Sequence, residues 1–205
     1  MMDLALFGKS LLLGLAIAAP LGPIGTLCIN RTLENGFAAG VSGGLGTALA
    51  DALYAALAAI GFAAFSVWLS VLDTPLRLIG GAFMLWLGFR SFKSQPSSGT
   101  AKVSARDILG TMAATFTLTV VNPMTILSFT ALFAGLGLAA SASGTHALLV
   151  VAGVFTGSML WWIILSAGIS IARHRMSGTL AVWISRVSGI LLLAFGLWAL
   201  ATALI

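Results

Sequence analysis

Two prolines separated by two residues, Pro20 and Pro23, interrupt the first long apolar stretch of the chain. Each proline removes a backbone hydrogen-bond donor, and its ring crowds the carbonyl four residues earlier, so a regular helix cannot pass through this stretch. Within a membrane, backbone that lacks helical partners is tolerated only where it is buried in protein or lines a wet cavity. Residues 19–25 therefore predict a broken membrane helix, the kind of element around which transporters build substrate sites.

The composition indicates a polytopic membrane protein. Hydrophobic residues make up 60% of the chain, charged residues make up 7%, and the mean hydropathy is +1.10. Such a chain has too little polar surface for a soluble globular domain. Its 205 residues suffice for about six membrane helices of roughly 20 residues each. We therefore expect an all-α fold with six transmembrane helices in one transporter domain, residues 1–205.

Apolar runs and turn signals predict the helix ends. Asn35-Gly36 is a turn signal, and Asp73-Thr74-Pro75 is typical of a helix N-terminus. A cleavable signal peptide is disfavoured because the first apolar run continues to Ile29. The helices are expected at about residues 4–29, 37–72, 75–92, 106–138, 146–172 and 180–204, the first broken at Pro20 to Pro23 and the fourth at Asn122-Pro123. The second run is too long for a straight membrane helix, so its end must bend.

The charged residues predict the orientation in the membrane. The net charge of +5 favours attraction to anionic lipid, and we expect no nucleic-acid partner. The loops of one side carry Arg31, Arg90, Lys93, Lys102, Arg106, Arg173 and Arg175, and the other side shows only Lys9 and Arg77. By the positive-inside rule, the loop 93–105 is cytoplasmic and both termini are periplasmic in the bacterial inner (plasma) membrane.

Matching positions suggest that the second half of the chain repeats the first. The pairs are Pro23 with Pro123, Gly46 and Gly61 with Gly153 and Gly168, Asp51 with Ser158, Tyr54 with Trp161, and Arg77 and Gly80 with Arg186 and Gly189. Because each half holds three helices, the two halves would be inverted in the membrane. The prediction is a 3+3 inverted repeat with broken helices 1 and 4: repeat 1 at about 1–92, a cytoplasmic linker at 93–105 and repeat 2 at about 106–205.

Asp51 is the only charged residue in the second apolar run. A charge at the centre of a membrane helix costs at least about 2.5 kcal/mol by insertion scales unless it faces the protein interior. One interpretation is a proton-coupling or cation-binding group, and the other is a structural acid bonded to another helix. We favour proton coupling, because the sequence places no intramembrane Lys or Arg near Asp51 as a structural partner.

The breaks suggest how a substrate is held. A helix that restarts after Pro23 aims unpaired N–H groups and its positive dipole end at an anion, while carbonyls released before Pro20 can accept from an ammonium. These two ends suit a zwitterion, although simple proline kinks that only shape the bundle are the alternative. The expected substrate-binding set is Pro20, Gly22, Pro23, Gly25, Thr26, Tyr54, Asn122, Pro123, Thr125 and Ser158. Tyr54 shares a helix face with Asp51, and packing explains it equally well.

Two further patterns are interpreted as packing features. The row Gly36, Gly40 and Gly44 is typical of close helix contacts rather than a phosphate loop, because no Lys follows it. The same row is compatible with contacts within one chain or in a homodimer. Trp161-Trp162 is interpreted as lipid or core packing rather than a ligand cage.

The remaining reactive side chains indicate neither an enzyme nor a metal protein. Cys28 is a single cysteine in apolar surroundings, and His146 and His174 lie at the two ends of one expected helix. We therefore expect no metal and no cofactor. Ser42 lies in a Gly-x-Ser-Gly stretch that superficially resembles the nucleophile of rhomboid proteases, but neither histidine lies at its depth to act as a base.

Together these residues are similar to those of the lysine exporter (LysE/RhtB) family of amino-acid efflux translocators. The resemblance rests on Pro20-Leu21-Gly22-Pro23, Gly36, Gly40, Gly46, Asp51, Tyr54, Gly61 and Asn122-Pro123. It implies secondary export of amino acids or related small zwitterionic or cationic metabolites across the inner membrane, driven by proton exchange. A passive small-solute channel is the first alternative, and an intramembrane serine hydrolase using Ser42 is the second.

Overall fold

The computed structural model describes residues 2–20, 22–93, 105–122, 125, 128–129, 144–173 and 178–204. Its helices are α1 (Met2–Ala18), α2 (Pro23–Asn35), α3 (Phe37–Lys93), α4 (Ala105–Val120), α6 (Gly144–Arg173) and α7 (Gly178–Ala203). The part of the chain that the structure describes contains no strand. The expected all-α fold is therefore confirmed for this part.

The first expected helix is broken where the sequence predicts. α1 ends before Pro20, and α2 restarts at Pro23 with Gly22 as its N-cap residue. The two helices meet at 81°, a far sharper change of direction than a kink within one continuous helix. α2 ends at Gly36, whose φ of 87° lies in the left-handed region and whose N–H donates to the carbonyl of Thr32 at 2.9 Å. The predicted break and the predicted Asn35-Gly36 turn are both confirmed.

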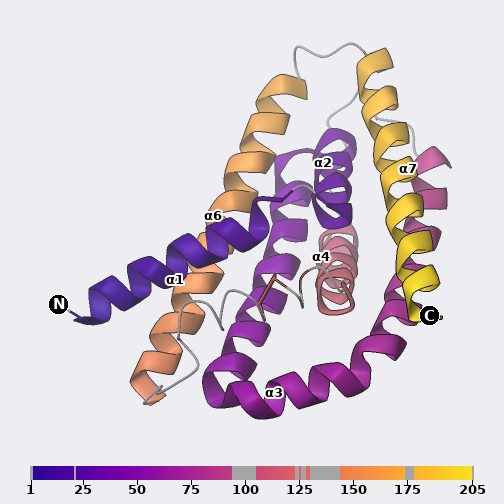
Figure 1. Cartoon of the computed structure of the whole chain (residues 1–205). Helices are drawn as coiled ribbons and strands as arrows, with labels where there is room; N and C mark the ends of the chain where they lie inside the picture. The colour runs from indigo at the N-terminus through magenta and orange to yellow at the C-terminus, as the bar shows by residue number, and fades with distance from the viewer. Residues whose placement is uncertain are drawn as a thin grey trace.

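α3 is a single helix of 57 residues that changes direction. Figure 1 shows it running down beside α6, across the bottom of the molecule and up again beside α7. Pro75 lies inside this helix, so the predicted separation at residues 73–75 is wrong. An internal proline removes one backbone hydrogen bond and bends a helix, and packing on both arms can keep the helix continuous. The expected bend of the second apolar run is present.

Several helical stretches have the length and hydropathy to cross a membrane. Among the described residues these are Phe37–Ala59, Thr145–Ala172 and Val182–Ala203, with the bent pair Asp3–Ala18 and Pro23–Asn35 as a fourth candidate and Thr74–Phe89 as a shorter apolar helix. α4 ends at Val120, two residues before Asn122, at which a second break is expected. Pro123, most of the segment after it and residues 94–104 of the linker lie outside the described residues.

Glycines allow two pairs of helices to approach closely. α1 crosses α6 at Gly157, where an added Cβ would meet the backbone of Leu11. The second arm of α3 lies on α7 at Gly81 and Gly196, each of which faces the other's carbonyl oxygen. Such contacts are typical of membrane helices, whose association depends on close packing rather than on the hydrophobic effect.

The glycine row at the start of α3 has the packing role that the sequence predicts. A Cβ at Gly40 would meet the side chains of Thr32 and Ser166, and a Cβ at Gly44 would meet Trp162. The first arm of α3 is therefore held close to α2 and α6 within one chain.

The surface of the molecule is apolar, and polar side chains lie inside. Leu148, Ile171 and Phe89 are 71%, 67% and 65% exposed, whereas Thr115 and Thr119 are fully buried. A soluble protein does not place so many large apolar side chains on its surface. This distribution fits a protein whose surroundings are lipid, and it agrees with the expected multi-pass membrane protein.

Candidate functional site

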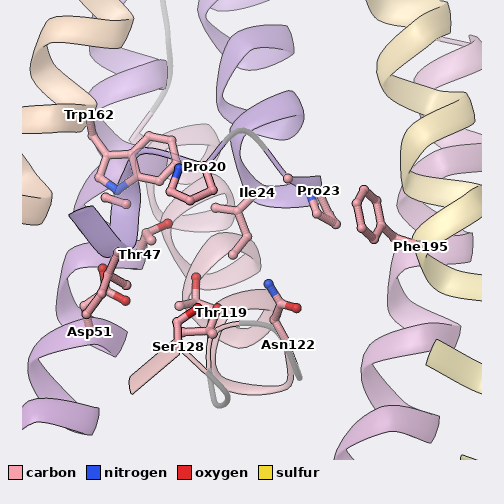
Figure 2. A pocket seen from close by; sticks show the side chains of 14 residues that line it. Pro20, Pro23, Ile24, Thr47, Asp51, Thr119, Asn122, Ser128, Trp162 and Phe195 are labelled. Atoms are coloured by element: carbon pink, nitrogen blue, oxygen red, sulfur yellow. The ribbon is translucent and has the colours of Figure 1, made fainter. Parts of the chain in front are cut away.

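A cavity of about 250 Å³ lies where the α1–α2 break meets α3, α4, α6 and α7 (Figure 2). The break contributes Pro20, Gly22 and Pro23 to the cavity wall, and α3 contributes Asp51. The lining residues are Ile17, Ala18, Pro20, Gly22, Pro23, Ile24, Thr47, Asp51, Thr119, Asn122, Thr125, Ser128, Trp162 and Phe195. The cavity thus joins the break, the buried acid and the end of α4, which the sequence places far apart.

The cavity has one polar side and one apolar side. Figure 2 shows Asp51, Thr119, Ser128 and Asn122 along the lower side. The upper side carries Trp162, Pro20, Ile24, Pro23 and Phe195. A molecule held between the two sides would therefore meet hydrogen-bonding groups on one face and apolar groups on the other.

Asp51 links α3 to α6 and is almost fully buried, at 1% exposure. Its Oδ2 accepts a hydrogen bond from the Ser158 hydroxyl at 2.7 Å. Its Oδ1 has no hydrogen-bond partner among the residues that the structure describes. Burying a carboxylate oxygen without a donor is costly, so a proton, a cation or a water molecule bound to this oxygen would stabilise it.

The N-terminal end of α2 opens on the same cavity. Gly22 offers no side-chain cap, and Pro23 has no N–H. Thr26 bonds its own helix, because its N–H donates to the Gly22 carbonyl at 3.1 Å and its hydroxyl to the Pro23 carbonyl at 2.8 Å. The N–H groups of Ile24 and Gly25 therefore have no intrahelical acceptor, and the positive end of the helix dipole lies at this point.

The C-terminal end of α1 contributes the opposite polarity. Ile17 and Ala18, at the end of α1, line the cavity and are separated from Pro20 only by Ala19. Because Pro20 has no N–H, the carbonyl of Ala16 has no donor at its usual helical position. Hydrogen-bond acceptors from α1 and donors from α2 thus flank one break, as the double proline predicts.

Tyr54 lies behind the cavity wall rather than in it. Its hydroxyl donates to the carbonyl of Val120, the last residue of α4, at 2.5 Å. Its ring packs against Phe129 with the ring centroids 5.4 Å apart. Tyr54 therefore satisfies a carbonyl at the helix end and holds α4 against α3.

The structure gathers most of the expected site into one place. The cavity wall contains Pro20, Gly22, Pro23, Asp51, Asn122 and Thr125, and Ser158 contacts Asp51. Gly25, Thr26 and Tyr54 are buried but absent from the lining. Pro123 lies outside the described residues.

Sequence reasoning missed lining residues that lie one helical turn from predicted ones. Thr47, Thr119, Ser128 and Trp162 are three or four residues from Asp51, Asn122, Thr125 and Ser158, respectively. Helical spacing alone could have identified them, because such pairs share a helix face. The interpretation of Trp162 as packing is incomplete, since its side chain also lines the cavity. Phe195 has no comparable signal, because only the folded chain brings α7 to the break.

Ser42 and His146, the residues of the hydrolase alternative that the structure describes, are not brought together. The Ser42 hydroxyl donates to the carbonyl of Ala39 at 2.8 Å, within its own helix. The neighbouring Gly40 faces Ser166 of α6. His146 lies near the other end of α6, on the order of 30 Å from Ser166 by helix rise, and its Nε2 is 3.4 Å from a carboxylate oxygen of Asp3. His174 is outside the described residues.

A comparison with known families agrees with this geometry. The sequence profile of the family described as "LysE type translocator" matches residues 15–202. The chain belongs to this family. The match covers the last turn of α1, nearly all of α7 and every element between them, including all the residues that line the cavity. The resemblance proposed from the sequence is therefore confirmed.

Three relatives of this translocator cover most of its length. The "Uncharacterized membrane protein YahN" of Escherichia coli (strain K12) is 30% identical over 181 residues, 82% of this chain and 77% of the relative. The "Putative amino acid efflux protein YcgF" of Bacillus subtilis (strain 168) is 26% identical over 197 residues, 94% of each chain. The "Chemotactic transduction protein ChpE" of Pseudomonas aeruginosa is 30% identical over 182 residues, 85% of this chain and 87% of the relative. No solved structure matches this translocator.

Proposed function

We propose that this translocator is a secondary active exporter of amino acids or related small zwitterionic or cationic metabolites, working by proton exchange. One observation carries the proposal. Asp51 lines a small cavity beside the α1–α2 break and the end of α4, with one carboxylate oxygen held by Ser158 and the other without a described partner. The name of the Bacillus subtilis relative, "Putative amino acid efflux protein YcgF", supports the substrate class.

Competition between a proton and the substrate for one oxygen atom of Asp51 would couple proton entry to substrate export. The Ser158 hydroxyl occupies Oδ2 of Asp51, so Oδ1 is the atom that can take either a proton or a substrate ammonium. Substrate would bind the deprotonated acid from the cytoplasm, and a proton from outside would displace it. The protonated carrier would then return and release its proton to the cytoplasm. Each ligand favours its own state of the carrier, as exchange requires.

The substrate carboxylate would lie at the start of α2. The N–H groups of Ile24 and Gly25 have no intrahelical acceptor there, and anions bind well at such helix ends. Asn122 lies on the opposite, polar side of the same cavity (Figure 2). A zwitterion could in this way place its ammonium near Asp51 and its carboxylate near the helix end.

Packing around the cavity supports the inverted 3+3 repeat. Gly46 of the first half lies against Met112 of α4. Its pair in the second half, Gly153, lies against Phe7 and Ser10 of α1. In each half the second helix thus packs on the first helix of the other half, as a two-fold relation requires. Rocking of one half against the other would open the cavity to alternate sides of the membrane.

The proposed orientation follows the basic residues. We place the linker 93–105 in the cytoplasm and both termini in the periplasm of a bacterial inner membrane, because loop Lys and Arg favour the cytoplasmic side. A homodimer is compatible with this arrangement, since α3, α6 and α7 all carry exposed apolar side chains.

Purified protein in liposomes tests the proposal. Vesicles are loaded with a mixture of radiolabelled amino acids, and efflux is measured with and without acidification outside. We expect acidification to accelerate efflux and Asp51→Asn to abolish that acceleration. Asp107→Asn changes an exposed acid at the start of α4 and is the matched control. The opposite result would favour a passive channel. In that case the rate of efflux would not change with the pH gradient, and Asp51→Asn would behave as wild type.

A further inference from the structure

The charge of the cavity wall narrows the range of substrates. Asp51 is the only Asp, Glu, His, Lys or Arg among the described lining residues. The neighbouring stretch 123–143 contains none of these residue types in its sequence. The second cation of a basic amino acid would therefore lack a counter-ion, and an acidic side chain would meet Asp51. Either charge would be buried without compensation, which is strongly unfavourable.

The apolar side of the cavity requires a matching part in the substrate. Trp162 and Phe195 lie at its two ends, with Ile24 and the prolines between them (Figure 2). The apolar side chain of a bound amino acid would cover these groups, whereas free glycine as the substrate would leave them facing water or empty space. The cavity volume of about 250 Å³ lies below the range of roughly 300–1,000 Å³ that is usual for drug-sized ligands. The occupant is thus a single small metabolite.

Trp162 offers a donor as well as an apolar surface. Its Nε1 is buried and has no acceptor among the described residues, while its side chain lines the cavity. A buried indole N–H normally finds a partner. A carboxylate oxygen of the substrate would be the acceptor for this N–H, and every amino acid carries such an oxygen.

We infer that the cavity selects a neutral amino acid with an apolar side chain, with Phe195 and Trp162 as the residues that set this preference. The inference rests on the proposed export function and narrows its substrate class. Asp51 would take the ammonium, the start of α2 and the Trp162 N–H would take the carboxylate, and Phe195 with Ile24 would cover the side chain.

Competition in proteoliposomes tests the substrate class without any variant. Vesicles that contain the wild-type protein and unlabelled leucine take up radiolabelled leucine by counterflow, and other unlabelled amino acids are added as competitors. We expect methionine and phenylalanine to compete well, and lysine and glutamate to compete at least about 100-fold more weakly. Lysine that competes as well as leucine would overturn the inference and leave the export function standing. If no amino acid enters by counterflow, the export function fails and the inference fails with it.

Two pairs of variants test the roles of the aromatic residues. Phe195→Ala should raise the half-saturating leucine concentration about 10-fold to 100-fold and affect alanine much less, because an apolar contact is lost. The control Phe83→Ala truncates a residue packed against the same core cluster that does not line the cavity. Trp162→Phe should raise the half-saturating concentration of both amino acids about 10-fold. Its control is Trp161→Phe, which removes an indole N–H that is buried outside the lining. Equal effects in a variant and its control would overturn the assignment of that residue.

Discussion

At the scale of single residues, one hydrogen bond sets the chemistry of the buried acid. The sequence offers Asp51 as either a proton carrier or a structural acid bonded to another helix. The structure combines the two descriptions, because the Asp51 side chain lines the cavity, its Oδ2 bonds Ser158 of α6, and its Oδ1 has no partner among the described residues. One side chain can therefore hold two helices together and still exchange a ligand.

The Ser158→Ala variant tests this arrangement. It leaves both oxygens of Asp51 without a described donor, and we expect the free energy of unfolding to fall by about 1–3 kcal/mol. Ser166→Ala on the same helix is the matched control, because the Ser166 hydroxyl is buried and has no partner among the described residues. Thermal unfolding of both purified variants in detergent gives the comparison. Similar losses in the two variants would contradict a special role for the Asp51 contact.

Tyr54 is predicted to act through α4 rather than on the substrate. Tyr54→Phe keeps the ring on Phe129 and removes the hydroxyl that donates to the Val120 carbonyl. We expect a loss of about 1 kcal/mol in the free energy of unfolding with little change in the half-saturating substrate concentration. Thermal unfolding and concentration-dependent counterflow measure the two quantities. A large rise in half-saturating concentration at unchanged stability would instead place the hydroxyl in contact with the substrate.

At the scale of elements, helix breaks and close helix crossings depend on each other. The 81° bend between α1 and α2 sends α1 across α6, where Gly14 of α1 leaves room for the backbone of α6 and Gly153 and Gly157 of α6 leave room for the backbone of α1. Larger side chains at this crossing would push α1 outward and with it the wall formed by Ile17 and Ala18. The prolines create the ends of the two helices, and the glycines determine where those ends lie.

Gly157→Ala should separate α1 from α6, because the new Cβ would meet the backbone of Leu11. Overpacking of this kind typically lowers the free energy of unfolding by about 1–3 kcal/mol. Gly168→Ala, on the same helix, adds a Cβ with nothing within 4 Å and should stabilise the helix by up to about 1 kcal/mol. Detergent thermal stability of the two variants is the measurement. A Gly157→Ala protein as stable as wild type would mean that α1 does not cross α6 this closely.

At the scale of the whole molecule, the described helices form two sets that surround one cavity. α1, α2 and α3 belong to the first half of the chain, and α4, α6 and α7 belong to the second. The last turn of α6 and the first turn of α7 lie at the top of Figure 1, whereas α7 ends at the lower right. The end of α6, at Arg173, therefore lies at the opposite end of the molecule from the end of α7. This placement is consistent with the proposed orientation, in which the basic loops are cytoplasmic and both termini are periplasmic.

Cysteine labelling tests the proposed orientation. Cys28 is fully buried, and replacing it by alanine gives a background without thiols. We expect a membrane-impermeant maleimide to label Leu204→Cys, an exposed site near the C-terminus, in spheroplasts. Ser97→Cys in the linker should react only in inverted vesicles, because basic loops remain in the cytoplasm. The reverse labelling pattern would mean that the protein has the opposite orientation in the membrane.

The sequence by itself determined the features that depend on local chemistry. Composition identified a membrane protein, Pro20 and Pro23 located the break, and Asn35-Gly36 located the next helix end. Each follows from the geometry or polarity of the residues at that place. Asp51 could also be singled out, because a charged residue within a long apolar run is costly enough to stand out before its neighbours are known.

Only the tertiary structure decided which residues share the cavity and which remain behind its wall. α3 continues through Pro75 because packing on both arms outweighs one lost hydrogen bond. Tyr54 bonds Val120, and Phe195 reaches the break from the last helix. These contacts join residues that are distant along the chain. Their positions are set by how whole helices cross, and no local pattern contains that information.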